Sequence, residues 1–201
     1  MGKAMIASKM TDGQVENFVD KFRAALRKHR ADISSETAQQ VLGVENIGMK
    51  LFSVVRKYSE YFSEMIVRRV KVNRDRTPQE MLDAIGWKKY FDKQVVPTMP
   101  RGEGDDVEVI FFNVGHHITD AELDQEYELR GLKPADPYSV AAVNEADPEF
   151  SDTRPNCTHW KDANDKWCYV VFDRVDDGHE VHVEQNNSYW DDYWWFAGLR
   201  K

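Results

Sequence analysis

The chain closes on a dense group of aromatic residues. Six of the eight residues from Tyr189 to Phe196 are aromatic. Aromatic side chains bury large areas and dominate the energetics of cores and interfaces, whereas a tail that merely ends a protein is polar and mobile. The stretch therefore predicts a segment that packs or binds.

This stretch divides into a loop and a strand. Residues 186–192 mix turn-forming Asn, Asp and Ser with Tyr and Trp, and residues 193–199 have the composition of a final strand. Trp194 and Phe196 then share one face and Trp195 lies on the other, and we expect one face to enter the core. Two interpretations stay open: a ligand-binding loop before a strand, and an ordinary turn before a buried strand.

Charge separates the chain into two parts. Residues 1–76 hold 15 Lys+Arg against 9 Asp+Glu, whereas residues 77–201 hold 12 against 26, for a net charge of -8. This asymmetry predicts two modules and argues against electrostatic binding of nucleic acid by the whole molecule. We predict an α+β protein with a helical module over 1–65 and a second domain over 66–201.

The first module is predicted as three helices, at 12–30, 35–42 and 45–65. Thr11 and Gln14 form a capping box before the first helix. Each helix carries one apolar stripe, so we expect the three to pack into a small bundle or hairpin that is basic outside. A unit of about 60 residues is only marginally stable alone. The module is therefore expected to form a homo-oligomer or to dock a partner.

The second domain is predicted to mix helices with strands. Residues 66–72 alternate, with Ile66, Arg68, Val70 and Val72 on one side. Helices are expected from Thr77 to Gly86, over 120–130 and from Asp136, and a strand over 107–113. Residues 167–172, the turn 176–178 and residues 180–184 then predict an antiparallel β-meander whose third strand is the aromatic stretch.

Two alternative functions remain open. The five basic residues of 66–76 suit phosphate contacts in a nucleic-acid-associated protein, although this segment lacks interleaved aromatic residues that stack bases. Cys157 and His159 are the one pair that resembles a nucleophile and its base, as in a small enzyme of unknown reaction. Partners two residues apart seldom reach catalytic geometry. We expect a protein that is not an enzyme.

No metal, cofactor or membrane span is predicted. The candidate metal clusters, His116 with His117, Cys157 with His159, and His179 with His182, match no zinc spacing. The chain has two cysteines, no apolar run near the roughly 20 residues that span a bilayer, and no signal-peptide pattern in its first six residues. We expect a cytoplasmic location.

The portion from about residue 66 to the end resembles a set of uncharacterised proteins of small-genome bacteria. The matching segments are 76–80, 99–104, 127–138, 158–163 and 194–200. The residues before Trp194-Trp195-Phe196-Ala197-Gly198 differ greatly among those proteins. This layout looks like that of the variable proteins of diversity-generating retroelements, which carry a C-type-lectin fold and a hypervariable segment ending near an aromatic-Gly-x-Arg strand.

The resemblance implies a display surface and its scaffold. It assigns ligand binding, to an unknown protein or other macromolecule, to Gln185, Asn186, Asn187, Ser188, Tyr189, Asp191, Asp192 and Tyr193. The scaffold would be Trp195, Phe196, Gly198 and Arg200. The chain lacks the disulfide pair and the Glu-Pro-Asn calcium loop of the commoner lectin pattern. A sugar- or calcium-dependent lectin activity is therefore not expected.

Overall fold

The computed structural model describes residues 10–63, 65–176 and 178–201. The chain divides into two units, Met1–Lys57 and Tyr58–Lys201. This division falls inside the third helix, whereas the sequence places the boundary at residue 65. The amino-terminal residues tested for a signal peptide and the turn residue Asp177 lie outside the described residues.

The first unit contains the predicted helices: α1 (Asp12–Lys28), α2 (Ser35–Leu42) and the greater part of α3 (Ile47–Ser63). The capping box of Thr11 and Gln14 forms as expected. No side chain of α1 or α2 is buried, and Phe18 and Phe22 of α1 are 50% and 47% exposed. The expected packed bundle is therefore not seen among the described residues, because one stripe per helix in so short a unit leaves the apolar surface of α1 uncovered.

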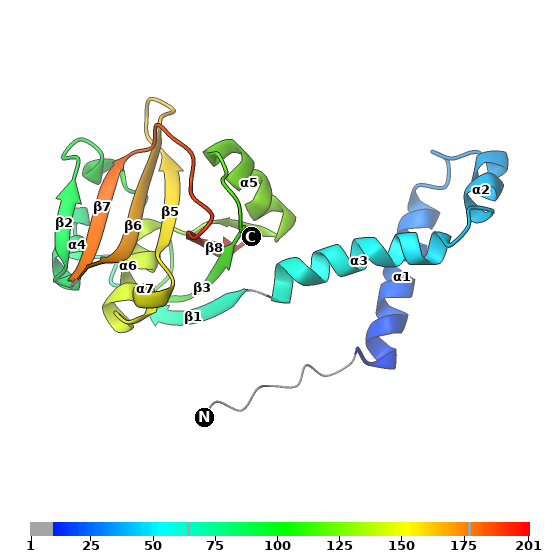
Figure 1. Ribbon diagram of the computed structural model, residues 1–201, viewed down its shortest axis with the longest axis horizontal. Helices are drawn as coiled ribbons and strands as arrows, with labels where there is room; N and C mark the ends of the chain where they lie inside the picture. The colour runs from blue at the N-terminus through cyan, green and yellow to red at the C-terminus, as the bar shows by residue number, and fades with distance from the viewer. Residues whose placement is uncertain (1–9, 64, 177) are drawn as a thin grey trace. The chain divides into compact units, whose positions relative to one another are not determined.

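The second unit is built on one mixed sheet of eight strands (Figure 1). The strands are β1 (Ile66–Lys71), β2 (Lys88–Phe91), β3 (Asp106–Asn113), β4 (Leu132–Pro134), β5 (Asn156–Lys161), β6 (Trp167–Val175), β7 (Gly178–Gln185) and β8 (Trp195–Arg200). Their order is β1-β3-β8-β5-β6-β7-β2, and β4 also pairs with β8. The α+β class is confirmed.

Short helices connect and cover the strands. They are α4 (Pro78–Ile85), the 3-10 turn η1 (Val96–Thr98), α5 (Asp120–Leu129), α6 (Pro137–Ala146) and α7 (Phe150–Thr153). The helices predicted to start near residues 77 and 120 each begin with a capping box, at Thr77 and Thr119, and Asp136 caps α6 by accepting a bond from the Ser139 N–H. Within the described ranges, none of the helices has the length and apolar content needed to cross a membrane.

Both faces of the sheet are buried over its centre. Alternation along β3 sends Val109 and Phe111 to one face, where they pack with α4, α6 and α7. Ile110 and Phe112 point to the opposite face and pack with α5. The predicted alternation of β1 is confirmed, since Ile66, Arg68 and Val70 are less exposed than their neighbours.

The position of β8 corrects the predicted meander. β5, β6 and β7 do form an antiparallel meander, but β8 lies between β3 and β5, antiparallel to β3 and parallel to β5. The far edge of β7 is occupied by β2. Phe196 and Ala197 are both fully buried, on opposite faces, so the expectation of one core face was wrong. A strand that is apolar on both faces is stable at the centre of a sheet, where both faces are covered.

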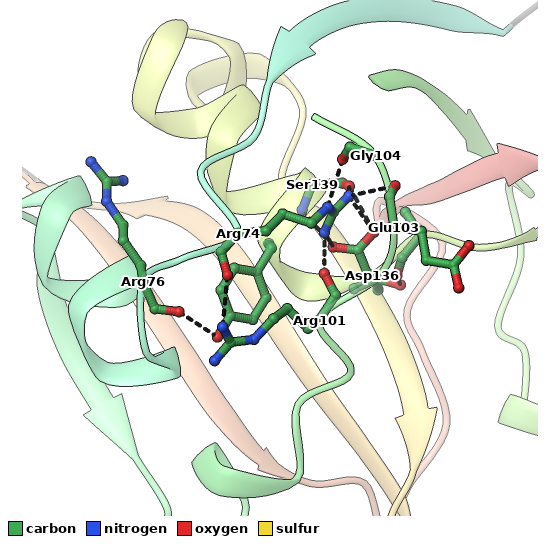
Figure 2. A network of polar contacts seen from close by, with 10 residues as sticks. Arg74, Arg76, Arg101, Glu103, Gly104, Asp136 and Ser139 are labelled. Atoms are coloured by element: carbon green, nitrogen blue, oxygen red, sulfur yellow. Dashed lines mark hydrogen bonds and ion pairs between the residues drawn. The ribbon is translucent and has the colours of Figure 1, made fainter. Parts of the chain in front are cut away.

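A buried arginine fastens the loop after η1 to the start of α6 (Figure 2). The Arg74 guanidinium donates to Asp136 Oδ1 at 2.7 Å, to Ser139 Oγ at 3.0 Å and to the Gly104 carbonyl at 2.6 Å. Arg101 returns a bond to the Arg74 carbonyl at 2.7 Å. Because the side chains of Arg74 and Asp136 are 11% and 6% exposed, this pair orders the loop instead of facing a partner.

Candidate functional site

The segment between β7 and β8 is anchored in its first half by Asp120 at the start of α5. Asn186 Nδ2 donates to Asp120 Oδ2 at 2.8 Å, and the Trp190 indole N–H donates to Asp120 Oδ1 at 2.9 Å. The backbone of Trp190 also forms a two-bond bridge with Ile118. Trp190 is only 5% exposed. The loop that follows β7 is therefore held against the body of the domain.

A second anchor holds the end of this segment. The Asn113 side-chain amide donates to the carbonyls of Asp192 at 2.7 Å and Trp194 at 2.8 Å. The Trp195 N–H then donates to the Pro155 carbonyl at 2.8 Å as β8 begins. Both ends of the segment are consequently fixed by groups distant in the sequence, which leaves its backbone little freedom.

Behind the first anchor lies a buried histidine between two carboxylates. His159 Nδ1 is 2.6 Å from Asp120 Oδ1, and Nε2 is 3.2 Å from Asp124 Oδ1 without hydrogen-bond geometry. The ring stacks on Trp167 with centroids 4.6 Å apart. Burial disfavours the charged ring, but the carboxylates of Asp120 and Asp124 outweigh it, so the pKa of His159 is raised. His159 thus stabilises the negative charge of Asp120, the carboxylate that accepts hydrogen bonds from Asn186 and Trp190.

The residues assigned to ligand binding differ in exposure. Asn187, Ser188, Tyr189, Asp192 and Tyr193 are exposed, with Tyr189 at 60% and Tyr193 at 48%. The other three assigned residues, Gln185, Asn186 and Asp191, are half-buried. Exposed side chains thus stand on an anchored backbone.

Half-buried members of the set have internal partners. Asn186 is bound to Asp120, and Asp191 Oδ1 lies 3.2 Å from His117 Nδ1. The His117 ring in turn contacts Tyr189, with centroids 5.2 Å apart. Asn186 therefore has an anchoring role that the sequence did not indicate, whereas Tyr189 keeps an open face.

A groove of about 320 Å³ runs beside this segment on the face of the sheet that α5 covers elsewhere. Its side chains come from two strands and the segment itself: Tyr169 and Asp173 of β6, His182 of β7, and Tyr189, Trp190 and Trp194. The rings of Tyr169 and Trp194 each meet Trp190 edge to face, at 5.5 Å and 6.0 Å between centroids. The groove is thus aromatic on several sides, with a carboxylate among its lining groups.

The polar groups of the groove are partly desolvated. Burial raises the pKa of Asp173. Burial and the negative charge of Glu184 raise the pKa of Tyr169, whose hydroxyl lies 3.1 Å from Glu184 Oε2. Burial, together with Asp191 and Asp173, raises the pKa of Tyr193.

Sequence reasoning missed the contributions of β6 and β7 to the site. Tyr169, Val171 and Asp173 occupy alternate positions, opposite the buried face of Val170 and Phe172. This alternation was the available signal, since a strand with one continuous apolar face presents its other residues together. The meeting of Asp120 with Trp190 had no local signal, because the two lie 70 positions apart.

The possible catalytic pair of Cys157 and His159 is not assembled. Burial raises the pKa of Cys157 well above its ordinary value, and its thiol approaches the Trp195 carbonyl at 3.7 Å. Both ring nitrogens of His159 face carboxylates, so this ring is not placed as a free base. Cys168 is a second buried free thiol.

The histidine clusters do not form a metal centre in the described part of the chain. Among those residues, no group of three or more His, Cys, Asp or Glu is arranged to hold a metal ion. His179 Nε2 lies 2.6 Å from Asp152 Oδ1, whereas His182 Nε2 lies 3.2 Å from Glu180 Oε2. The two histidines thus have separate carboxylate partners.

The basic residues of 66–76 are largely paired within the domain. Arg68 lies 3.5 Å from Asp147, Arg69 3.0 Å from Glu108 and Arg76 2.7 Å from Glu145. The remaining arginine of the run is the buried Arg74. Neutralised arginines attract phosphate weakly, so this arrangement disfavours the nucleic-acid alternative.

A larger cleft of about 580 Å³ lies where β4 and β5 diverge from β8. Its lining includes Asp124, His159 and Trp167 together with the loop at Gly102 and Glu103. His159 of this cleft is already held by the carboxylates of Asp120 and Asp124, of which Asp124 is the more exposed. The histidine in this cleft is therefore not placed as a free base.

Comparison of the chain with protein-family models, with curated proteins and with solved structures found no match.

Proposed function

We propose that the protein is a binding module, not an enzyme, which presents residues 185–193 and the adjoining groove to a protein ligand. The observation that carries the proposal is the division of labour within one short segment. Asn186 and Trp190 hold its backbone through Asp120, while Tyr189 and Tyr193 stay exposed. A folded core alone would not require large aromatic side chains at the two exposed positions.

The chemistry of the exposed residues supports recognition of a protein surface. Tyr supplies a large contact area at small conformational cost, and Asn and Ser supply adaptable hydrogen bonds, as in antibody paratopes. An anchored backbone reduces the entropy lost on association, because less chain has to be ordered when the ligand binds. The segment combines these two properties.

The proposal includes the finer fold and family. We assign the domain to the C-type-lectin-like proteins and the segment before β8 to the variable region of a retroelement-diversified protein. The support is the resemblance of residues 66–201 and the position of the exposed residues immediately before Trp194-Trp195-Phe196-Ala197-Gly198. A cytoplasmic location is part of the same proposal and is supported by the two free cysteines.

The test is selection of ligands from a random peptide library displayed on phage. The immobilised wild-type protein is the target, and each enriched peptide is then measured against Tyr189→Ala and Tyr193→Ala. A matched control is Lys166→Ala, which removes an exposed side chain from the β5–β6 hairpin.

We expect enriched peptides to bind the Lys166→Ala protein normally and the tyrosine variants at least about 30-fold more weakly, as with aromatic hot spots. Peptides that bind all three variants alike would place the binding surface elsewhere. That result, or the absence of any enriched peptide, would contradict the proposal.

A further inference from the structure

We infer that the groove beside residues 185–193 receives an arginine side chain of the protein ligand, with its guanidinium at the Asp173 carboxylate. The inference rests on the proposed function, because it names the chemistry that the same surface recognises. Part of its evidence is separate: the carboxylate of Asp173 and the rings of Trp190 and Trp194 do not belong to the exposed tyrosine pair.

The Asp173 carboxylate forms no salt bridge with a Lys or Arg in the described part of the chain, although His182 lies close enough to favour its ionisation. Its Oδ1 accepts the Arg174 N–H at 2.7 Å, but the Arg174 guanidinium turns away and pairs with Asp152 at 2.9 Å. A half-buried carboxylate loses solvation, and an approaching cation compensates that loss. Asp136 and Asp147, two other carboxylates of this domain that are not exposed, each have an arginine partner.

The other charged groups around Asp173 favour the same ligand. Glu180 lies close enough to oppose ionisation of Asp173, and Glu184 accepts the Tyr169 hydroxyl. No Lys or Arg is among the described residues that line the groove, and His182 Nε2 faces Glu180 Oε2 at 3.2 Å. The Asp173 carboxylate is therefore the lining group that attracts a cation and repels an anion.

The aromatic lining selects arginine over lysine. A guanidinium is planar, stacks on aromatic faces and binds a carboxylate through two parallel N–H bonds, whereas an ammonium is a compact, strongly hydrated charge. Tyr189, Trp190 and Trp194 line the same groove as Asp173. A volume of about 320 Å³ is at the small end of ligand pockets and suits one long side chain.

The charge of the surrounding sequence extends the preference beyond the groove. Residues 77–201 carry 26 acidic against 12 basic residues. Such an excess attracts a basic segment at long range and raises its rate of association. A ligand segment with further lysines or arginines near the bound arginine is thus favoured over an acidic one.

The test compares two blocked tripeptides, acetyl-Gly-Arg-Gly-amide and the same peptide with citrulline, a neutral side chain of nearly the same shape. A lysine tripeptide is the third probe. Binding to the full chain is followed by NMR through the Trp190 indole N–H. Asp173→Asn removes the charge while keeping the shape, and Asp165→Asn removes a charge from an exposed hairpin turn as its matched control.

We expect the arginine peptide to bind at least about tenfold more tightly than the citrulline and lysine peptides. This preference should disappear in Asp173→Asn and persist in Asp165→Asn, with the folded spectrum of both unchanged. Equal binding of arginine and citrulline by the wild type, equal binding of lysine, or a preference that survives Asp173→Asn would each overturn the inference.

The phage selection separates this failure from that of the proposed function. Peptides that require Tyr189 for binding but carry no arginine would support the binding module and contradict the inference that the groove binds arginine. Peptides whose binding does not depend on Tyr189 would contradict the proposed binding function itself.

Discussion

The Trp190 indole N–H donates to Asp120 Oδ1 at 2.9 Å, across 70 residues of sequence. The same oxygen lies 2.6 Å from His159 Nδ1, and the other oxygen accepts the Asn186 amide at 2.8 Å. One carboxylate thus joins the start of α5, strand β5 and the segment before β8. Because Asp120 is 6% exposed, each of these bonds is shielded from competing water.

We predict that Asp120→Asn destabilises the domain by roughly 3 kcal/mol, the loss typical of removing one partner of a buried ion pair. The variant leaves the buried His159 ring without its nearest negative charge. Urea unfolding measures the loss, and hydrogen exchange at the Trp190 N–H measures loosening of the segment. Asp124→Asn is the control, since its side chain is 48% exposed. A larger loss at Asp124 than at Asp120 would contradict this account of the anchor.

The raised pKa of His159 predicts a dependence of stability on pH. The folded protein binds this proton more tightly than the unfolded chain, whose histidine titrates near pH 6.5. The contribution is therefore fully present below about pH 6.5 and is lost as the pH rises through the higher pKa of the folded state. An NMR titration of the His159 ring checks the direction. A midpoint below that of a free histidine would show that burial outweighs the two carboxylates.

Anchor and display residues should respond differently to truncation. We predict that Trp190→Ala costs roughly 3 to 5 kcal/mol of unfolding free energy, as large buried aromatic side chains do. Tyr189→Ala and Tyr193→Ala should stay within about 0.5 kcal/mol of wild type, because their side chains are largely exposed. Chemical denaturation of the three variants tests this. Equal losses at all three positions would mean that the whole segment is core.

Gly102 and Gly104 form a matched pair in the loop that Arg74 holds through the carbonyls of Arg101, Glu103 and Gly104 (Figure 2). Both have positive φ, at 71° and 74°, so alanine strains the backbone by roughly 1 kcal/mol at either. A Cβ at Gly102 would also lie 2.2 Å from Asp136 Oδ2 and 2.8 Å from Arg74 Nη1, whereas one at Gly104 would meet nothing within 4 Å. We predict that Gly102→Ala is the more destabilising by at least about 2 kcal/mol, since it displaces a buried ion pair. Similar melting temperatures for the two variants would contradict that role of the Arg74–Asp136 pair.

The uncovered stripe of α1 predicts self-association of the chain. Val15, Phe18 and Phe22 lie on that stripe and are each at least 41% exposed. Exposed apolar stripes of this kind are normally covered by a partner. We expect light scattering to give a mass above that of one chain and Phe18→Asp with Phe22→Asp to return it to the monomer. The control is the pair Lys21→Asp with Arg23→Asp, charged positions on the same helix. A wild-type protein with the mass of one chain would contradict the prediction of self-association.

Local features of this chain could be predicted from the sequence because their causes lie within a few residues. The caps at Thr77, Thr119 and Asp136 bond to groups three positions ahead, so the starts of α4, α5 and α6 were evident. Alternation likewise indicated the faces of β1, and the predicted strands at 167–172 and 180–184 cover most of β6 and β7. The exposure of Tyr189 and Tyr193 agreed with a loop of turn-forming residues.

Long-range pairing was decided only in the folded protein. The aromatic stretch reads as a strand in either position, but it enters the sheet between β3 and β5 because it is apolar on both faces and the edge of β7 pairs with β2. The groove and its Asp173 appear once β6 and β7 lie beside the segment. The role of Asp120 depends on partners 39, 66 and 70 residues away. Burial makes such a carboxylate costly unless it is bonded, and only the tertiary structure brings its donors together.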